Sequence, residues 1–379
     1  MGEWTVRAFA PGRTEVAGNH LDHQGGRVIS AAVTQGTQVL ARPNAQGVVR
    51  MRSKGYMSYE IRVDGPDDLR PRVEEAGTSA GLVRGMMAGL AEAGVPVQGF
   101  DAQVSATLPP GGGLSSSASF EMAVGRAIEA LAGAEPLPPL QLAAIGARSE
   151  QEFFGKPCGL QDQSASACGG IQLLDFAEPS APTADPIAFD FAAHGHAVVL
   201  VDSRCDHSQF TAEFAQVVND MAAAAGFFGV ERLGQVDAVA YRTRIRDVAR
   251  KLGDAVALRG FHYFNELHLV DARVAALRAG DMEAFLAATR RSAVSSAQYL
   301  QNVAVPGSAQ QPAMVALALA DSLLDGRGAC RIHGGGFGGT IQAYVPLDAL
   351  DAFVSGIEAT LGRGVCNVVQ IEPRGAYAE

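Results

Sequence analysis

Residues 109–119 (PPGGGLSSSAS) combine glycines and hydroxyls in a pattern that is typical of phosphate binding. Glycine lets the backbone approach a ligand closely, and the free N–H groups of a first helical turn, with the helix dipole, attract an anion. The adjacent hydroxyls of Ser115, Ser116 and Ser117 can bond phosphate oxygens or ligate Mg²⁺. The alternative is a glycine-rich turn with a serine helix cap. We favour a phosphate site because this segment stands between a predicted strand and a predicted helix.

The segment differs from two better-known motifs. A Walker A loop, GxxxxGK[ST], needs a lysine, and the chain has only three lysines, at positions 54, 156 and 251. A nucleophile elbow, GxSxG, needs a glycine where Ser117 stands. The sequence therefore excludes both motifs at this place.

A second segment, residues 158–163 (CGLQDQ), offers an acid for proton handling. Phosphoryl transfer needs a group that takes or orients the proton of the acceptor hydroxyl, and Asp162 suits that role. Glu150 precedes it on a predicted helix, where it could complete a Mg²⁺ site with a serine of the loop. Each acid alone is more often a surface charge or a helix cap, so the functional interpretation depends on their combination.

A third segment, residues 10–28, is dense in hydrogen-bonding side chains among glycines, namely Arg13, Asn19, His20, Asp22, His23 and Gln24. Such density suits a polyol, because each hydroxyl seeks a donor and an acceptor. Arg13 could also keep Asp162 ionised and steady the transferring phosphoryl group. The alternative is a metal site made by His20, Asp22 and His23, which we place lower because their spacing matches no strong zinc pattern.

Residues 334–339 (GGGFGG) formally match the dinucleotide fingerprint GxGxxG. That fingerprint should open a helix, whereas the next residues, TIQAYV, alternate as in a strand. We therefore exclude a Rossmann site. We predict instead a tight loop that lies close to another backbone segment or to the phosphate loop.

Hydrophobic periodicity predicts the elements that position these segments. Strands are predicted at 28–40, 48–63, 102–108, 197–202, 329–333 and 340–345. Helices are predicted at 72–93, at 116–131 and from 138 to before 155, with several more between 211 and 325. The Pro- and Ala-rich residues 177–195 are turn-like and form the predicted domain boundary. These elements predict an α+β fold with a mixed sheet in each half.

Composition narrows the class of protein. The 379 residues, of which 47% are hydrophobic and 18% charged, suffice for two folded domains. A formal net charge of −10 argues against nucleic acid or an anionic membrane as the main partner. Five scattered cysteines without a CxxC pair are typical of reduced thiols, and neither a signal peptide nor a membrane-spanning stretch is apparent. We therefore expect a cytoplasmic protein with small-molecule partners, either a monomer or a homo-oligomer.

Taken in order, the segments resemble those of the galactokinase family of the GHMP kinase superfamily. Residues 12–28 (GRTEVAGNHLDHQGGRV) resemble the galactokinase signature, residues 109–119 the phosphate loop, and CGLQDQ the CGxxDQ segment that carries the catalytic aspartate. IHGGGFGG at 332–339 resembles the third GHMP motif, and VDSRCDHSQFTAEF at 201–214 resembles the stretch between the two domains. The resemblance covers nearly the whole chain.

The resemblance implies a GHMP kinase fold, with an N-terminal ribosomal protein S5 domain 2-like domain at 1–190, a C-terminal ferredoxin-like α/β domain at 191–379 and the active site in the cleft between them. It implies transfer of the γ-phosphate of ATP to the anomeric hydroxyl of galactose, with Mg²⁺. Asp162 would be the catalytic aspartate with Arg13 as its partner, and Ser117 and Glu150 would hold Mg²⁺. The sugar would be bound by Asn19, His20, Asp22 and Phe214, and ATP by Gly111, Gly112, Gly113, Leu114, Ser115, Ser116, Ser117, Ala118 and Ser119.

Two departures from the family pattern concern the sugar. The signature usually reads GEH, whereas this chain has Asn19 in place of the sugar-binding glutamate and so loses charge assistance. Phe214 aligns with a sugar-contacting tyrosine and lacks its hydroxyl. Such changes can switch substrate preference, so arabinose, galacturonate or an amino sugar are alternative acceptors. A non-catalytic sensor of sugar and nucleotide has little support, because Asp162 and Arg13 are both present.

Overall fold

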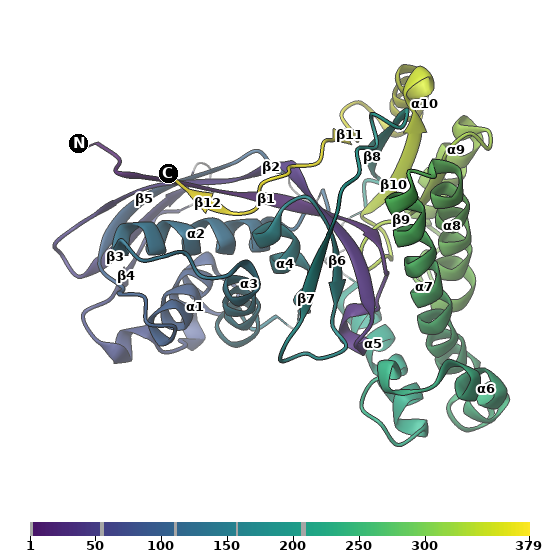
Figure 1. Ribbon diagram of the computed structural model, residues 1–379, viewed down its shortest axis with the longest axis horizontal. Helices are drawn as coiled ribbons and strands as arrows, with labels where there is room; N and C mark the ends of the chain where they lie inside the picture. The colour runs from purple at the N-terminus through teal and green to yellow at the C-terminus, as the bar shows by residue number, and fades with distance from the viewer. Residues whose placement is uncertain (1–2, 54–56, 110–111, 157, 206–209) are drawn as a thin grey trace.

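The computed structural model describes residues 3–53, 57–109, 112–156, 158–205 and 210–379. Within these ranges the strands form two sheets, of eight and four strands. Figure 1 shows the larger sheet with helices on one side of it, and the smaller sheet packed beside a bundle of longer helices. Across the same ranges, no helix combines the length and the apolar character needed to cross a membrane.

The larger sheet is built on two long strands, β1 (Val6–Ala17) and β2 (Arg27–Pro43), which pair antiparallel. The other strands are β3 (Val48–Ser53), β4 (Tyr59–Arg62), β5 (Phe100–Ala106), β6 (Ile171–Asp175), β7 (Thr183–Ile187) and β12 (Tyr377–Ala378). The strand order is β12-β1-β2-β5-β3-β4, and β6 pairs with β2 and β7. Because β3 and β5 are parallel while the others pair antiparallel, this sheet is mixed, as predicted.

Four helices lie on one side of the larger sheet (Figure 1), and they are α1 (Ser79–Glu92), α2 (Ser116–Ala132), α3 (Pro139–Arg148) and α4 (Gln161–Cys168). A π-helical turn, Ser149–Phe154, continues α3, and such turns are frequent at functional sites. The helix predicted at 72–93 begins later than expected, at residue 79. Gly77 has a φ of 74°, and the side chain of Thr78 then caps α1 by accepting from the N–H of Gly81.

The smaller sheet has the order β11-β8-β10-β9. Its strands are β8 (His196–Asp202), β9 (Ala329–Ile332), β10 (Thr340–Pro346) and β11 (Cys366–Val369), and every pairing in it is antiparallel. The prediction of a mixed sheet in this half is therefore wrong. The physical reason is that the short 333–339 loop turns β10 straight back on β9, whereas parallel pairing needs a long crossover.

The helices that accompany the smaller sheet follow one another from residue 211. They are α5 (Thr211–Phe227), α6 (Ala238–Leu252), α7 (Asp254–Ala279), α8 (Met282–Ser295), α9 (Pro312–Leu324) and α10 (Leu350–Leu361). A second π-helical turn, Ser296–Leu300, extends α8. Short 3₁₀ turns lie at Asp22–Gln24, Pro66–Leu69, Val73–Glu75, Leu233–Gln235 and Leu347–Ala349. Helix α10 had no counterpart in the sequence-based expectation.

Among the described residues, one of the hydrophobic clusters contains residues from both halves of the chain. Leu21 and Val28 from the first sheet region pack in the same buried cluster as Tyr263 of α7 and Phe337 of the glycine loop. The last strand, β12, returns to pair with β1, so the end of the chain lies in the first sheet. The predicted boundary segment 177–195 contains β7 and is not a plain linker. The division into domains at residue 190 stays a prediction.

Candidate active site

Arg13 and Asp162 form an ion pair between β1 and the first turn of α4. The Nε of Arg13 donates to Oδ1 of Asp162 at 2.6 Å, and Nη2 donates to Oδ2 at 2.8 Å. Burial opposes ionisation of Asp162, but the charge and the hydrogen bonds of Arg13 outweigh it and hold the pKa of Asp162 below its ordinary value. The aspartate is therefore ionised at neutral pH and able to accept a proton.

Arg13 also holds the phosphate loop. Its Nη1 donates to the carbonyl of Gly113 at 2.7 Å, and its backbone N–H donates to the carbonyl of Leu114 at 3.1 Å. Ser115 immediately precedes α2 with a φ of 53°, and its hydroxyl donates to Oδ2 of Asp162. The loop, the acid and β1 are thus one hydrogen-bonded unit.

A cavity of 290 Å³, here called the phosphate cavity, opens at the N-terminus of α2. It is lined by Arg13, Lys156 and Asp162 together with six of the residues predicted to bind ATP, which are Gly112, Gly113, Leu114, Ser115, Ser116 and Ser117. The free N–H groups of the first turn and the helix dipole make this place favourable for an anion. The geometry therefore has the features that the sequence predicted for a phosphate loop.

Three other predicted ATP-binding residues do not line this cavity or cannot be placed. Ala118 and Ser119 are fully buried. The hydroxyl of Ser119 donates to the carbonyl of Ala10 at 2.8 Å and accepts from the N–H of Thr37 at 3.0 Å, so it fastens α2 to β1 and β2. Gly111 lies outside the described residues.

A second cavity, of 400 Å³ and here called the acceptor cavity, adjoins the phosphate cavity. Its walls include Glu15, His20, Asp22 and His23, with Gly334 and Gly335 of the glycine loop. Arg13, Lys156 and Asp162 line both cavities. The two cavities therefore meet at the Arg13–Asp162 ion pair. A group transferred from a ligand in one cavity to a ligand in the other would pass beside this pair.

The histidines of the 10–28 segment form a relay of hydrogen bonds. The amide of Gln24 lies 3.2 Å from Nδ1 of His23, Nε2 of His23 lies 3.3 Å from Nδ1 of His20, and Nε2 of His20 lies 3.0 Å from the carbonyl of Gly335. Because that carbonyl only accepts, each ring donates through Nε2 and accepts at Nδ1. Burial lowers the pKa of both histidines, that of His23 to about 3.

This relay uses every ring nitrogen of the two histidines, which leaves none to ligate a metal. Within the described ranges, no three His, Cys, Asp or Glu side chains are grouped so as to hold a metal ion. Both observations weigh against the alternative of a His20, Asp22 and His23 metal site.

Asp22 reaches into the acceptor cavity beside the CGLQDQ segment. Burial raises the pKa of Asp22 to about 6. A Cβ atom on residue 159 would lie 2.1 Å from Oδ2 of Asp22, so only Gly159 leaves room for this carboxylate. The glycine of the motif is therefore what lets the 10–28 segment and the CGLQDQ segment approach each other.

Asn19 lies beneath the acceptor cavity and does not line it. Its side chain is fully buried. The amide nitrogen donates to the carbonyl of Gly334 and lies 3.4 Å from Oε1 of Glu15, and the amide oxygen accepts from Nδ2 of Asn302 at 2.8 Å. Asn19 thus holds the glycine loop in place, and its role in sugar binding stays a prediction.

Phe214 also packs against the glycine loop. Its ring meets that of Phe337 edge-on at 5.7 Å between centroids, and a Cβ on Gly335 would lie 2.2 Å from Cε1 of Phe214. The α5 residue that lines the acceptor cavity is Val218, one helical turn further on. Contact between Phe214 and a sugar also stays a prediction.

The glycine loop at 334–339 connects β9 to β10, so the strand expected after it is confirmed. Positive φ angles at Gly334, Gly336, Gly338 and Gly339 favour glycine there. A Cβ on Gly113 would lie 3.0 Å from Nδ1 of His333, the residue that precedes the loop. Within the loop, a Cβ on Gly336 would lie 2.1 Å from the carbonyl oxygen of Asn302, so the prediction of a loop close to another backbone segment or to the phosphate loop is confirmed for the first alternative.

Comparisons with known proteins agree with this geometry. The model of the GHMP kinases N terminal domain matches residues 81–170, and the galactokinase galactose-binding signature matches residues 2–43. The galactokinase of Streptomyces coelicolor is 30% identical over 353 residues, which cover 92% of this chain and 87% of that protein. This chain belongs to the galactokinase family.

A further galactokinase is similar in sequence, and two solved structures share the fold. The galactokinase of Mannheimia succiniciproducens is 29% identical, over 91% of this chain and 86% of its own. The structure of Lactococcus lactis galactokinase complexed with galactose superposes with a TM-score of 0.83 at 23% identity, covering 98% of this chain and 95% of that chain. A D-glycero-D-manno-heptose 1-phosphate kinase superposes with a TM-score of 0.68 at 15% identity, covering 99% and 98%. The chain therefore has the GHMP kinase fold that its motifs implied.

In this galactokinase-family protein, Ser117 and Glu150 offer oxygen ligands of the kind that Mg²⁺ prefers. The hydroxyl of Ser117 donates to Oε1 of Glu150 at 3.1 Å, and Nε2 of Gln163 donates to Oε2 of the same carboxylate at 3.0 Å. Gln163 also donates to Glu121, whose pKa burial and the nearby Glu150 raise well above its ordinary value. Because Mg²⁺ is usually held by one or two carboxylates plus substrate phosphates, this donor set fits the ion.

Sequence reasoning missed two charged residues of the site. Lys156 lines both cavities, and its Nζ donates to Oε1 of Glu150 at 3.0 Å. Glu15 lines the acceptor cavity while its Oε1 accepts from Nη2 of Arg331 at 2.7 Å. Lys156 was visible as one of the few lysines, and Glu15 as a carboxylate inside the signature, four residues before Asn19.

Proposed function

We propose that this protein is a galactokinase, which transfers the γ-phosphoryl group of ATP to the anomeric hydroxyl of galactose. Membership of the family and the match to the galactose-binding signature support the activity. The observation that carries the proposal is that the phosphate cavity and the acceptor cavity share Arg13, Lys156 and Asp162. A nucleotide phosphate in one cavity and a sugar in the other would meet at an ionised aspartate.

In the proposed reaction, the sugar hydroxyl passes its proton to a carboxylate oxygen of Asp162 while its oxygen attacks the γ-phosphorus. The bond between the γ-phosphorus and the bridging oxygen breaks, and ADP leaves. Arg13 keeps Asp162 ionised before transfer and, together with Lys156, offsets negative charge on the moving phosphoryl group. Ser117 and Glu150 would hold Mg²⁺, which supplies charge neutralisation of the ATP phosphates.

The charges around the acceptor cavity bear on which sugar binds. Glu15, Asp22, Glu150 and Asp162 line it together with Arg13 and Lys156, so its carboxylates outnumber its cations. A uronic acid would place its own carboxylate among these acids, so the lining supports a neutral sugar over galacturonate. Arabinose and amino sugars remain candidates that the charge argument does not disfavour.

The direct test is ADP release in a coupled assay with Mg-ATP and a panel of galactose, arabinose, galacturonate and galactosamine. We expect turnover on galactose, and its loss in Asp162→Ala while ATP still binds by calorimetry. Turnover on another sugar with none on galactose would overturn the proposed acceptor. Ligand-induced thermal shifts without turnover on any sugar would favour a non-catalytic sensor.

We also propose a cytoplasmic setting, with ATP and the sugar as the partners of a monomer or a homo-oligomer. Cys158, Cys168, Cys205, Cys330 and Cys366 are all free thiols, which suits a reducing compartment. Size-exclusion chromatography with light scattering would distinguish a monomer from an oligomer.

A further inference from the structure

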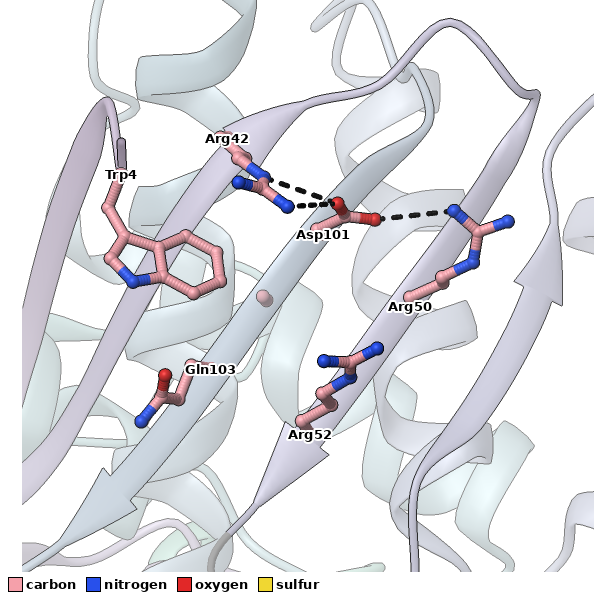
Figure 2. A pocket seen from close by; sticks show the side chains of 7 residues that line it. Trp4, Arg42, Arg50, Arg52, Asp101 and Gln103 are labelled. Carbon is pink, nitrogen blue, oxygen red and sulfur yellow. Dashed lines mark hydrogen bonds and ion pairs between the residues drawn. The ribbon is translucent and has the colours of Figure 1, made fainter. Parts of the chain in front are cut away.

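A cavity of 540 Å³ lies on the open face of the larger sheet, away from the site described above. Figure 2 shows its side chains standing on β2, β3 and β5, with Trp4 beside them. Along β5, Ala102 and Val104 are buried in the core, so Asp101 and Gln103 project from the opposite face. None of the residues that line this cavity belongs to the phosphate or acceptor cavity.

The sheet register brings three arginines together there. Arg42 of β2 and Arg50 of β3 both pair across the sheet with Asp101 of β5, and Arg52 of β3 pairs with Gln103. Nη2 of Arg42 lies 3.0 Å from Oδ2 of Asp101, and Nη1 of Arg50 lies 3.5 Å from Oδ1. The Asp101 carboxylate thus stands between the guanidinium groups of Arg42 and Arg50, and a third guanidinium, that of Arg52, stands two residues further along β3.

Arg52 differs from its neighbours because no ion pair ties it to the described part of the chain. Arg50 donates to Glu60 at 2.6 Å in addition to its contact with Asp101. Arg50 and Arg52 project on the same side of one strand, where like charges repel. A bound anion would offset that repulsion, which is notable in a chain whose net charge is −10.

Trp4 supplies a flat apolar wall. The guanidinium carbon of Arg42 lies 5.2 Å from the centre of the Trp4 ring, a cation–π distance that fixes the orientation of the indole. In Figure 2 the ring stands across β5 from Arg52, and Gln103 lies below the ring on the Trp4 side of the strand. Aromatic faces of this kind pack against sugar rings and nucleotide bases, and the amide of Gln103 can both donate and accept.

We propose that this cavity binds a small phosphorylated molecule, with its phosphate held by Arg50 and Arg52 and its ring packed on Trp4. Guanidinium groups suit phosphate because their planar N–H donors match its oxygens. The volume is within the range of small-ligand sites. A sugar phosphate and a nucleotide both carry this chemistry, and the site is independent of the proposed function.

The chain offers a direct reporter, because Trp4 is its only tryptophan. Tryptophan fluorescence of the full-length protein would be titrated with galactose 1-phosphate, with ADP and with inorganic phosphate. We expect a saturable change with one of the two organic phosphates, which identifies the source of the ligand. Binding should weaken as NaCl is raised, because the contacts are partly exposed charges. Inorganic phosphate binding as tightly as either organic phosphate would overturn the role of Trp4.

Two substitutions are expected to change the affinity for the ligand in opposite directions. Arg52→Gln should weaken the organic phosphate about tenfold, since one charge-assisted hydrogen bond is lost. Asp101→Asn should tighten binding severalfold, because it removes the carboxylate that competes for Arg42 and Arg50. Thermal melting of each variant checks that the fold is kept.

Arg62→Gln is the matched control, because Arg62 is an exposed arginine on the adjoining strand β4 and pairs with Asp64 outside the cavity. It should bind the phosphate as the unsubstituted protein does. A fluorescence response absent with all three ligands would overturn the proposal. So would a response that keeps its full strength in Arg52→Gln.

Discussion

Replacing Asp162 with asparagine tests whether the ion pair at the junction of the two cavities performs the chemistry. The change keeps the shape of the side chain and removes its charge. Its amide oxygen can still accept one hydrogen bond, but it can no longer take a proton from the sugar. Loss of a positioned base usually costs about 10²- to 10⁴-fold in rate, so kcat should fall by that factor.

The cost in stability should be small by comparison. Arg13 would lose two short charge-assisted bonds, at 2.6 and 2.8 Å. Such bonds contribute about 1.5–3 kcal/mol when buried, but the side chain of Asp162 is 37% exposed, so solvent screening reduces the value. We expect the free energy of unfolding to fall by about 1 kcal/mol. Urea unfolding would measure it beside kcat from ADP release.

Asp348→Asn is the matched control, because Nη2 of Arg327 lies 2.6 Å from both carboxylate oxygens of Asp348 on the protein surface. This variant should keep full kcat and lose no more than about 0.5 kcal/mol. Calorimetric titration with ATP should give the same affinity in Asp162→Asn and in the unsubstituted enzyme. A folded Asp162→Asn variant that loses less than tenfold in kcat, or that loses ATP binding as well, would refute the assignment of Asp162 as the base.

Four further outcomes follow from the acceptor and phosphate cavities. The KM for galactose should rise about tenfold from pH 7 to pH 5, because Asp22, with a pKa of about 6, becomes neutral over this range. The value of kcat should stay level, because the pKa of Asp162 is depressed. In the Asp22→Asn variant, the pH profile should no longer show the rise in KM. Gly159→Ala should raise the same KM about tenfold in steady-state assays, because the new Cβ displaces the carboxylate of Asp22. Lys156→Gln should raise the KM for ATP about tenfold in steady-state assays, because it removes a cation from the phosphate cavity. Asn19→Glu should lower the free energy of unfolding by about 3 kcal/mol, since it buries a second carboxylate beside Glu15, and adding Glu15→Gln should restore part of that loss in urea unfolding.

Two parts of the site could be predicted from the sequence, namely the phosphate loop and the pairing of Arg13 with Asp162. Glycines and serines between a strand and a helix favour an anion site, and α2 does begin at Ser116. The pairing of Arg13 with Asp162 was predicted from chemical need, since a buried acid must have a partner to stay ionised. The structure places these two side chains in contact across 149 positions of the chain.

What the sequence did not predict depends on contacts between distant segments. Lys156 is far from the phosphate loop in the sequence, and the turn after the π-helical segment brings it to the phosphate cavity. The antiparallel second sheet was missed because strand pairing leaves a weak local pattern. Helix α10 was missed although its buried Phe353 and Ile357 stand at helical spacing. Side-chain direction within the signature was also beyond local reasoning, since Asn19 turns inward to the carbonyl of Gly334.

The geometry of Asn19 changes what its substitution says about the sugar. From the sequence, an amide at position 19 suggested a site with less negative charge. In the structure, Oε1 of Glu15 lies 3.4 Å from the amide of Asn19, and Glu15 itself lines the acceptor cavity. A carboxylate is therefore present next to the place where the usual signature has one, and Arg331 holds its pKa below the ordinary value despite burial. The acceptor cavity thus carries a carboxylate at Glu15 although residue 19 is an amide. We therefore expect Glu15, more than Asn19, to be the position at which sugar preference would be changed.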